Sequence, residues 1–316
     1  MPDAAAREAA VPEVAVREVA AREVARDAAA RDAAEEASAF SHPVVAPDST
    51  AAYGDHPDQV VDFYAPGGGG PGGRAPLVAV VHGGAWRARY DRRHITPFAD
   101  FLARRGFAVA TVEYRRGGAE GETATDGEPL AGRWPETFDD TAAALDALPG
   151  LAERHLPDAD PRRLVLTGHS AGGHLVLWAA ARHVLPPGSP WRLPAPPALR
   201  GVVALAPLAH LARAAELELC GGAVRQLLGT GGLFEERAAH ADPAALLPTG
   251  IATTLVQGRA DTVVPAEIAE AYADAAAMAG ESTGLTLLDG VGHFPLIDPA
   301  ADACAVVAEE IAQLAW

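Results

Sequence analysis

The stretch LVLTGHSAGG at residues 164–173 says most about the fold of this chain. An apolar run at 164–167 precedes the pattern GHSAG, and a helix-like stretch follows at 171–183. A G-x-S-x-G pattern between a buried strand and a helix is typical of a sharp turn that exposes the serine hydroxyl. Glycines suit this turn because a Cβ on either side of the serine would clash. We therefore predict that Ser170 is a nucleophile, with a structural serine as the alternative.

A second glycine-containing turn, in VVHGGAW at residues 80–86, follows an earlier apolar run. Backbone N–H groups at such a strand exit can stabilise a developing oxyanion. We predict that the amides of Gly83, Gly84 and Ala171 form this oxyanion hole, although the glycines could serve the turn alone. Trp86 and His169, which flank the two turns, are candidates for lining the substrate pocket, with simple packing as the alternative.

A serine nucleophile needs a base, and the base needs a third group that fixes its tautomer. In chains with this serine turn the order is serine, acid, histidine. Asp261 follows one apolar run and His293 follows the last one, so both are expected at the same edge of the sheet as Ser170. We predict a triad of these three residues. Asp289 and Asp298 are alternative acids, but both lie close to His293 in sequence.

Three histidines near these turns, His82, His169 and His174, resemble a metal-binding set. No H-E-x-x-H pattern or cysteine pair accompanies them, and Cys220 and Cys304 stand apart. We expect His82 to brace its own loop by hydrogen bonding, and the other two to pack beside the serine turn or to line the acyl pocket. No metal and no cofactor is predicted.

Apolar runs and helix-like stretches alternate from about residue 53 to the C-terminus. The runs lie at 60–64, 77–81, 107–112, 164–167, 202–206, 254–257 and 285–288, and the helix-like stretches at 95–105, 137–148, 171–183, 265–279 and 300–314. This alternation predicts an α/β fold with a mainly parallel central sheet and helices on both faces. It lapses at about 207–250, which predicts a small helical cap above the site.

Residues 1–40 differ from the rest, because Arg–Glu and Arg–Asp pairs recur there in a background of Ala and Val. Alanine favours helix, and mixed charges one turn apart support a solvated helix. We expect a dispensable tail, helical or disordered, before a catalytic domain at 41–316. A short oligomerisation helix and a misplaced translation start are the alternatives.

The composition of the chain limits its partners. The net charge of -17 over 316 residues argues against binding to nucleic acid or an anionic membrane. Apolar runs fall well short of the roughly 20 residues of a spanning helix, and the N-terminus lacks a signal-peptide pattern. We expect a cytoplasmic monomer or homodimer acting on a small-molecule acyl substrate.

With these motifs in hand, residues 53–314 resemble the α/β-hydrolase superfamily, above all small H-G-G-type carboxylesterases and kynurenine formamidases (arylformamidases). The similarity includes HGGAW at 82–86, EYR at 113–115, GHSAG at 168–172, DP at 242–243, GRADTVVP at 258–265 and GH at 292–293. It implies a metal-free acyl-enzyme mechanism on esters or activated amides. The loop lacks the third glycine of hormone-sensitive-lipase-like esterases, and the tail has no counterpart in the family.

The motifs and the resemblance together predict a serine carboxylic-ester hydrolase for small acyl esters. An arylformamidase would use the same machinery on N-formylkynurenine-type formamides, so it stays an alternative. A non-catalytic ligand receptor with this fold is an alternative of another class, as is a peptidase, although no propeller-sized domain is present to admit peptides.

Overall fold

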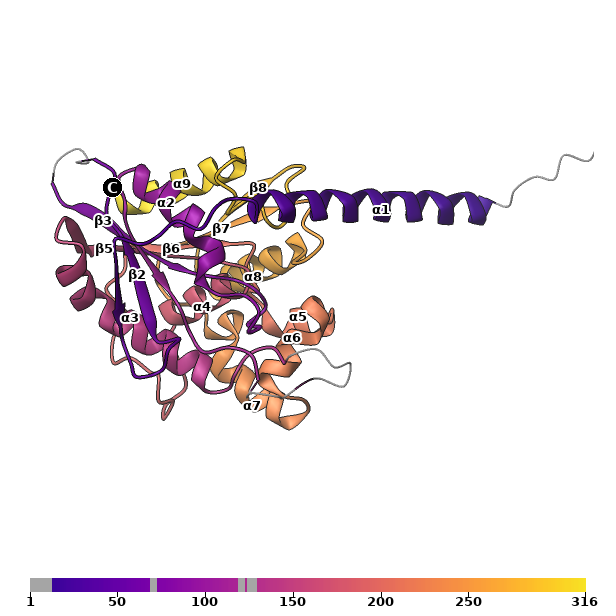
Figure 1. Ribbon diagram of the computed structural model, residues 1–316. Coiled ribbons are helices and arrows are strands. Elements are labelled where there is room, and N and C mark those ends of the chain that lie inside the picture. Colours follow the sequence, from indigo (N-terminus) through magenta and orange to yellow (C-terminus); the bar gives the residue numbers. More distant parts are fainter. Residues whose placement is uncertain (1–12, 69–72, 119–122, 124–129) are drawn as a thin grey trace, which may run out of the picture.

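The computed structural model describes residues 13–68, 73–118, 123 and 130–316. Its centre is an eight-stranded sheet in the order β1-β2-β4-β3-β5-β6-β7-β8 (Figure 1). β2 runs antiparallel to β1 and β4, and the other neighbouring strands are parallel. The strands are β1 (Ser49–Ala52), β2 (Val60–Tyr64), β3 (Ala75–Val81), β4 (Ala108–Val112), β5 (Ala159–His169), β6 (Gly201–Leu205), β7 (Thr253–Gly258) and β8 (Gly284–Leu288).

Helices cover both faces of this sheet, which confirms the predicted layering (Figure 1). On one face lie α2 (Thr96–Arg104), preceded by the 3₁₀ turn η1 (Arg92–Ile95), and α9 (Asp302–Ala315). On the other face lie α3 (Glu136–His155), α4 (Ala171–Ala180) and α8 (Ala266–Met278). The mainly parallel α/β architecture expected from the alternating pattern is therefore the observed one.

The central strand β3 shows why the apolar runs could be recognised. All seven of its residues are buried. Leu77, Ala79 and Val81 pack under the helices of one face, whereas Val78 and Val80 pack under those of the other. A strand covered on both sides must be apolar throughout, so it stands out in the sequence as an uninterrupted run.

Two differences from the prediction have a clear physical reason. β1 was not expected, because it is a short edge strand with alternate residues exposed and therefore lacks an apolar run. α3 was expected to end at residue 148, before Pro149, but it continues to His155. Proline removes one backbone hydrogen bond from a helix. The burial of Leu151 and Ala152 beyond it stabilises the extra turn.

The interval between β6 and β7, where a helical cap was expected, holds three short helices and a 3₁₀ turn (Figure 1). These are α5 (Leu211–Glu216), α6 (Leu219–Leu228), α7 (Gly232–Ala241) and η2 (Pro243–Leu246). The Asp242 carboxylate accepts the amides of Leu211 and Ala212 at 3.0 Å each. This one side chain therefore joins the beginning of α5 to the end of α7.

The N-terminal segment is helical over α1 (Glu13–Ala39), and residues 1–12 lie outside the described part of the chain. Figure 1 shows α1 projecting as a single long helix, with only its C-terminal end against the body of the protein. Among the described helices, none combines the length and apolar character needed to cross a membrane.

Candidate active site

Ser170 occupies the sharp turn between β5 and α4, with φ 56° and ψ -118°. L-residues rarely adopt such a positive φ, and this strain is characteristic of a serine presented at the end of a strand. A Cβ on Gly168 would lie 2.4 Å from the carbonyl oxygen of Gly172, and a Cβ on Gly172 only 2.0 Å from that of Val81. Close backbone packing therefore requires both glycines of the motif.

Asp261 and His293 follow β7 and β8, and their side chains form a hydrogen bond. His293 Nδ1 lies 2.7 Å from Asp261 Oδ2. The Asp261 carboxylate also accepts the amides of Val263 and Val264, at 2.9 and 2.8 Å, and the Gln257 side-chain amide at 3.1 Å. These donors hold the carboxylate in one orientation. A proton held on Nδ1 by the carboxylate leaves Nε2 of His293 able to accept another.

Ser170 and His293 line the same cavity, whose volume is about 320 Å³. His169, predicted to line the pocket, also does so. Its Nε2 lies 2.9 Å from the carbonyl oxygen of His293, which ties the serine turn to the loop of the base. Burial, together with the neighbouring His293, lowers the pKa of His169 well below its usual value. The ring is therefore neutral and donates to this carbonyl.

The two alternative acids form other contacts. Asp289 is almost fully exposed and pairs with Arg259 at 3.0 Å. Asp298 is bonded to Ser38 and His42 of the N-terminal segment. Of the three candidate acids, Asp261 is the one that contacts His293.

The loop after β3 passes directly against the serine turn. A Cβ on Gly83 would lie 2.7 Å from the carbonyl oxygen of His169, and Gly84 has φ +106°. Within the described residues, the amides of Gly83 and Gly84 make no hydrogen bond. Ala171 is the first residue of α4, where amides lack intrahelical acceptors. Of the three residues predicted to supply oxyanion donors, Gly84 lines the cavity, and Gly83 and Ala171 adjoin cavity residues in the chain.

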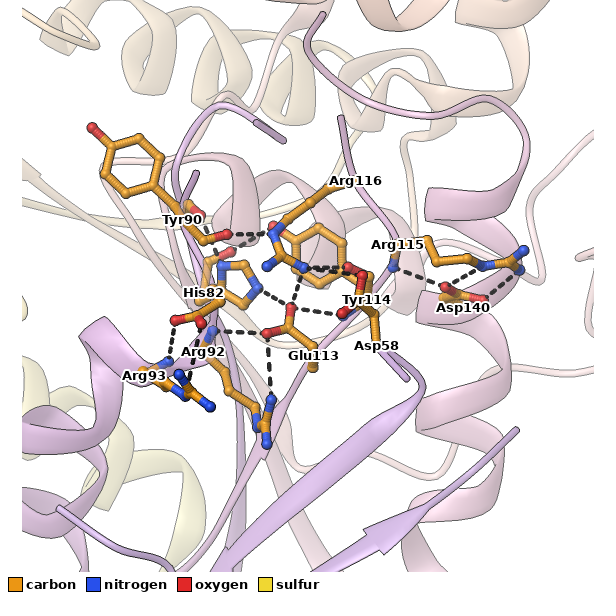
Figure 2. A network of polar contacts seen from close by, with 12 residues as sticks. Asp58, His82, Tyr90, Arg92, Arg93, Glu113, Tyr114, Arg115, Arg116 and Asp140 are labelled. Atoms are coloured by element: carbon orange, nitrogen blue, oxygen red, sulfur yellow. Dashed lines mark hydrogen bonds and ion pairs between the residues drawn. The ribbon is translucent and has the colours of Figure 1, made fainter. Parts of the chain in front are cut away.

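A buried charged network holds this loop from behind (Figure 2). His82 Nδ1 lies 2.8 Å from the carbonyl oxygen of Gly83, and its Nε2 lies 2.8 Å from Glu113 Oε1. Glu113 also accepts Arg116 Nη1 at 2.6 Å and the Arg92 amide at 3.0 Å. Burial alone would raise the pKa of Glu113, but His82, Arg116 and the Arg92 amide hold it at about 2. His82 therefore braces its loop against a permanent carboxylate.

The same network reaches the cavity wall. The Tyr114 hydroxyl donates to the carbonyl oxygen of His82 at 2.9 Å, and Arg116 donates to the carbonyl oxygen of Tyr90 (Figure 2). Tyr90 lines the cavity. Reasoning from single residues missed Glu113, and the available signal was the EYR pattern at 113–115 in the family resemblance.

The structure corrects the expectation that Trp86 walls the pocket. Trp86 is fully buried, lies edge-on to His174 with ring centroids 5.2 Å apart, and does not line the cavity. Ala85 and Trp86 both have positive φ values, 51° and 53°, so the chain turns the indole into the core. Phe40, Tyr90 and Phe294 supply the aromatic surface of the cavity instead.

Several other cavity residues carried no signal in the sequence. They are Ala85, Arg87, Arg89, His94, Cys220, Gly221, Val263 and Ile297. Cys220 comes from the cap, and burial raises the pKa of its thiol to about 11, so it stays protonated at neutral pH. Burial lowers the pKa of His94 to about 4, so this ring is neutral as well. Ser170 and His293, the predicted nucleophile and base, both line this cavity.

The end of α1 lies against the loops that carry Asp261 and His293. Arg31 donates to the carbonyl oxygen of Ala260, and Thr262 donates to Asp32. Glu35 accepts the amide of Gly292, next to His293, at 3.2 Å. The last turns of the segment predicted as a dispensable tail therefore contact both neighbours of Asp261 and the residue before His293.

The three histidines considered as a metal set point to different partners. His82 bonds to Glu113, His169 to the carbonyl oxygen of His293, and His174 Nε2 to that of Ala241 at 2.9 Å. Over the part of the chain that the structure describes, no group of three or more His, Cys, Asp or Glu side chains converges as a metal site.

Comparisons with known proteins agree with this architecture. A segment of 124 residues is 32% identical to the non-reducing polyketide synthase ausA of Aspergillus calidoustus, and one of 110 residues is 29% identical to the probable carboxylic ester hydrolase LipM of Mycobacterium tuberculosis. The matches cover 37% and 34% of this chain, but only 5% and 22% of those proteins.

A solved structure, a truncated carbohydrate esterase from gut microbiota, superimposes with a TM-score of 0.66 at 18% identity. The superposition covers 85% of this chain and 97% of that one, which shows a shared α/β-hydrolase fold. The sequence model of the BD-FAE family matches residues 61–275. Because that match spans more than half of the chain, the protein belongs to the BD-FAE family.

Proposed function

We propose that this protein is a serine carboxylic-ester hydrolase that cleaves small acyl esters through an acyl-enzyme. One observation carries the proposal. His293 is hydrogen-bonded to Asp261 at 2.7 Å, and it lines the same cavity as Ser170. A serine nucleophile, a histidine base and an acid that orients the base together suffice for acyl transfer.

In the first half of the reaction, Ser170 Oγ attacks the carbonyl carbon of the ester while His293 Nε2 takes the hydroxyl proton. Asp261 keeps the ring in the required tautomer and stabilises the imidazolium. The tetrahedral intermediate collapses when His293 returns the proton to the leaving alcohol. The acyl group is then esterified to Ser170.

In the second half, a water molecule attacks the acyl-enzyme with His293 again as the base, and the carboxylic acid leaves. The amides of Gly83, Gly84 and Ala171 stabilise the negative oxygen in both halves. One such donor is worth about 3 kcal/mol, so this site contributes several kcal/mol to lowering the barrier.

The decisive experiment compares hydrolysis of p-nitrophenyl acetate, p-nitrophenyl octanoate and N-formylkynurenine by the wild type and Ser170→Ala. We expect turnover of the short ester and a loss of about 10⁴-fold or more in kcat for Ser170→Ala. Activity that survives this substitution would remove Ser170 from the mechanism.

The same assay separates the alternative functions. Turnover of the formamide in preference to the esters would make the protein an arylformamidase. Absence of both turnover and labelling by a fluorophosphonate probe would support a ligand receptor. The proposal retains the cytoplasmic location, the monomeric or homodimeric state and the small-molecule substrate expected from the sequence.

A further inference from the structure

Phe40, the residue after α1, stands between two cavities. It lines the catalytic cavity of about 320 Å³ and a neighbouring one of about 370 Å³. Its ring lies 5.5 Å from that of Phe294, 5.6 Å from His94 and 6.3 Å from Tyr90, measured between centroids. Tyr90 and His94 also line both cavities, so these three rings form the partition between them.

The position of Phe40 is held from both sides by one carboxylate. Ser38 Oγ donates to Asp298 Oδ2 at 2.6 Å, and His42 Nε2 lies 2.7 Å from Asp298 Oδ1. Asp298 Oδ1 also accepts the Ala300 amide at 2.9 Å. Asp298 is only 4% exposed. Burial alone would raise its pKa, but these donors lower it, so the anchor is ionised at neutral pH.

Phe40 itself is 37% exposed, so the polar contacts of its neighbours add to the packing of its ring in fixing its position. An aromatic ring that lines a cavity and is held by polar contacts to a buried carboxylate on each side is suited to limiting what the cavity accepts. Tyr90 and His94 come from the segment after the oxyanion loop, whereas Phe40 comes from the N-terminal segment. The partition thus joins two parts of the chain that are distant in sequence.

We propose that Phe40, positioned by Ser38 and Asp298, is a specificity-determining residue that limits the length of the ester arm the catalytic cavity accepts. This inference rests on the proposed esterase function. Removing the ring takes away the part of the partition that Phe40 forms, so a longer arm can extend towards the outer cavity and gain apolar contacts, whereas a short arm gains none.

The test measures kcat/KM for wild type and Phe40→Ala on two substrate series. p-Nitrophenyl acetate, butyrate and octanoate vary the acyl arm, and phenyl and 1-naphthyl acetate vary the alcohol arm. We expect Phe40→Ala to raise the long-to-short ratio in one series by about tenfold or more, the effect of even one methylene in an apolar pocket. Val44→Ala, which alters only the outer cavity, should leave both ratios unchanged.

A second pair of variants tests the anchor. Ser38→Ala should shift the same ratio in the same direction by a smaller factor, and Ser38→Thr, which keeps the hydroxyl, should restore it. Unchanged ratios in both series for Phe40→Ala, or an equal loss on all substrates, would overturn the assignment while leaving the esterase function intact. A wild type without ester turnover would overturn both.

Discussion

The two halves of the site are supported in different ways. We name them after their proposed roles: the nucleophile half consists of Ser170 and the loop at 82–86, and the acid–base half consists of the loops that carry Asp261 and His293. Behind the nucleophile half, Glu113 and Arg116 are 1% and 6% exposed. Beside the acid–base half, Arg31 and Glu35 of α1 are 34% and 15% exposed.

This difference indicates how each half should respond to change. In the nucleophile half, a Cβ added to one of the packed glycines would lie only 2.0–2.7 Å from neighbouring backbone, which has no room to move away. A buried carboxylate that loses a partner cannot replace it with water. Breaking an ion pair that is partly exposed to water costs less stabilising free energy, because water replaces the lost partner. We therefore expect large, stability-linked effects in the nucleophile half and graded effects on activity where α1 supports the acid–base half.

The largest effect should come from the acid itself, however lightly its loop is supported. Asp261→Asn retains an oxygen for the amides of Val263 and Val264 but favours the wrong tautomer of His293. We expect kcat to fall by about 10⁴-fold with little change in Tm. Asp289→Asn, at an exposed carboxylate on the neighbouring loop, is the control. A loss below tenfold would exclude Asp261 as the orienting acid.

The next largest effect should come from Gly172→Ala, because the added Cβ meets the carbonyl oxygens of Val81 and His82 at 2.0 and 2.5 Å. We expect a loss of more than about 3 kcal/mol in the free energy of unfolding, measured in urea, together with lost activity. Gly232→Ala, where a Cβ meets nothing within 4 Å, is the matched control. Equal stability of the two variants would contradict the packed-backbone account.

Glu113→Gln should lower stability by about 2–3 kcal/mol at pH 7. The pKa of Glu113 is about 2 in the folded protein and near its ordinary 4.5 when unfolded. The stabilisation is therefore complete above about pH 5 and is lost as the pH falls from 4.5 towards 2.

Urea unfolding at several pH values measures this effect. The difference in the free energy of unfolding between wild type and Glu113→Gln should become smaller as the pH falls from 4.5 towards 2. Glu270→Gln, at an exposed position of α8, should show no such trend. A difference independent of pH would mean that charge on Glu113 does not stabilise the network.

The smallest effect should come from Arg31→Ala, which removes the contact between α1 and the carbonyl oxygen of Ala260. A half-exposed charged contact is worth about 1 kcal/mol, so we expect kcat/KM to fall about fivefold with Tm nearly unchanged. Arg26→Ala, whose side chain is 76% exposed, is the control. Identical kinetics for the two variants would mean that α1 does not support the acid–base half.

Much of the fold could be predicted because buried parallel strands and glycine turns leave local patterns. The strand at Val60–Tyr64 agrees at both ends with the apolar run, and the β5–α4 turn agrees with the GHSAG motif. The short edge strand β1 and the end of α3 were missed, because tertiary burial rather than local pattern determines them.

The sequence alone determined which residues are candidates for the triad and in which order they occur, because that chemistry needs particular side chains at the ends of particular strands. Only the tertiary structure decided what surrounds them. It turned Trp86 into the core, placed Glu113 against His82 of the loop at 82–86, and brought Ser38 to Asp298, 260 residues away, so that Phe40 lines the cavity. Contacts of this kind arise from the packing of distant elements, which leaves no periodicity or motif along the chain.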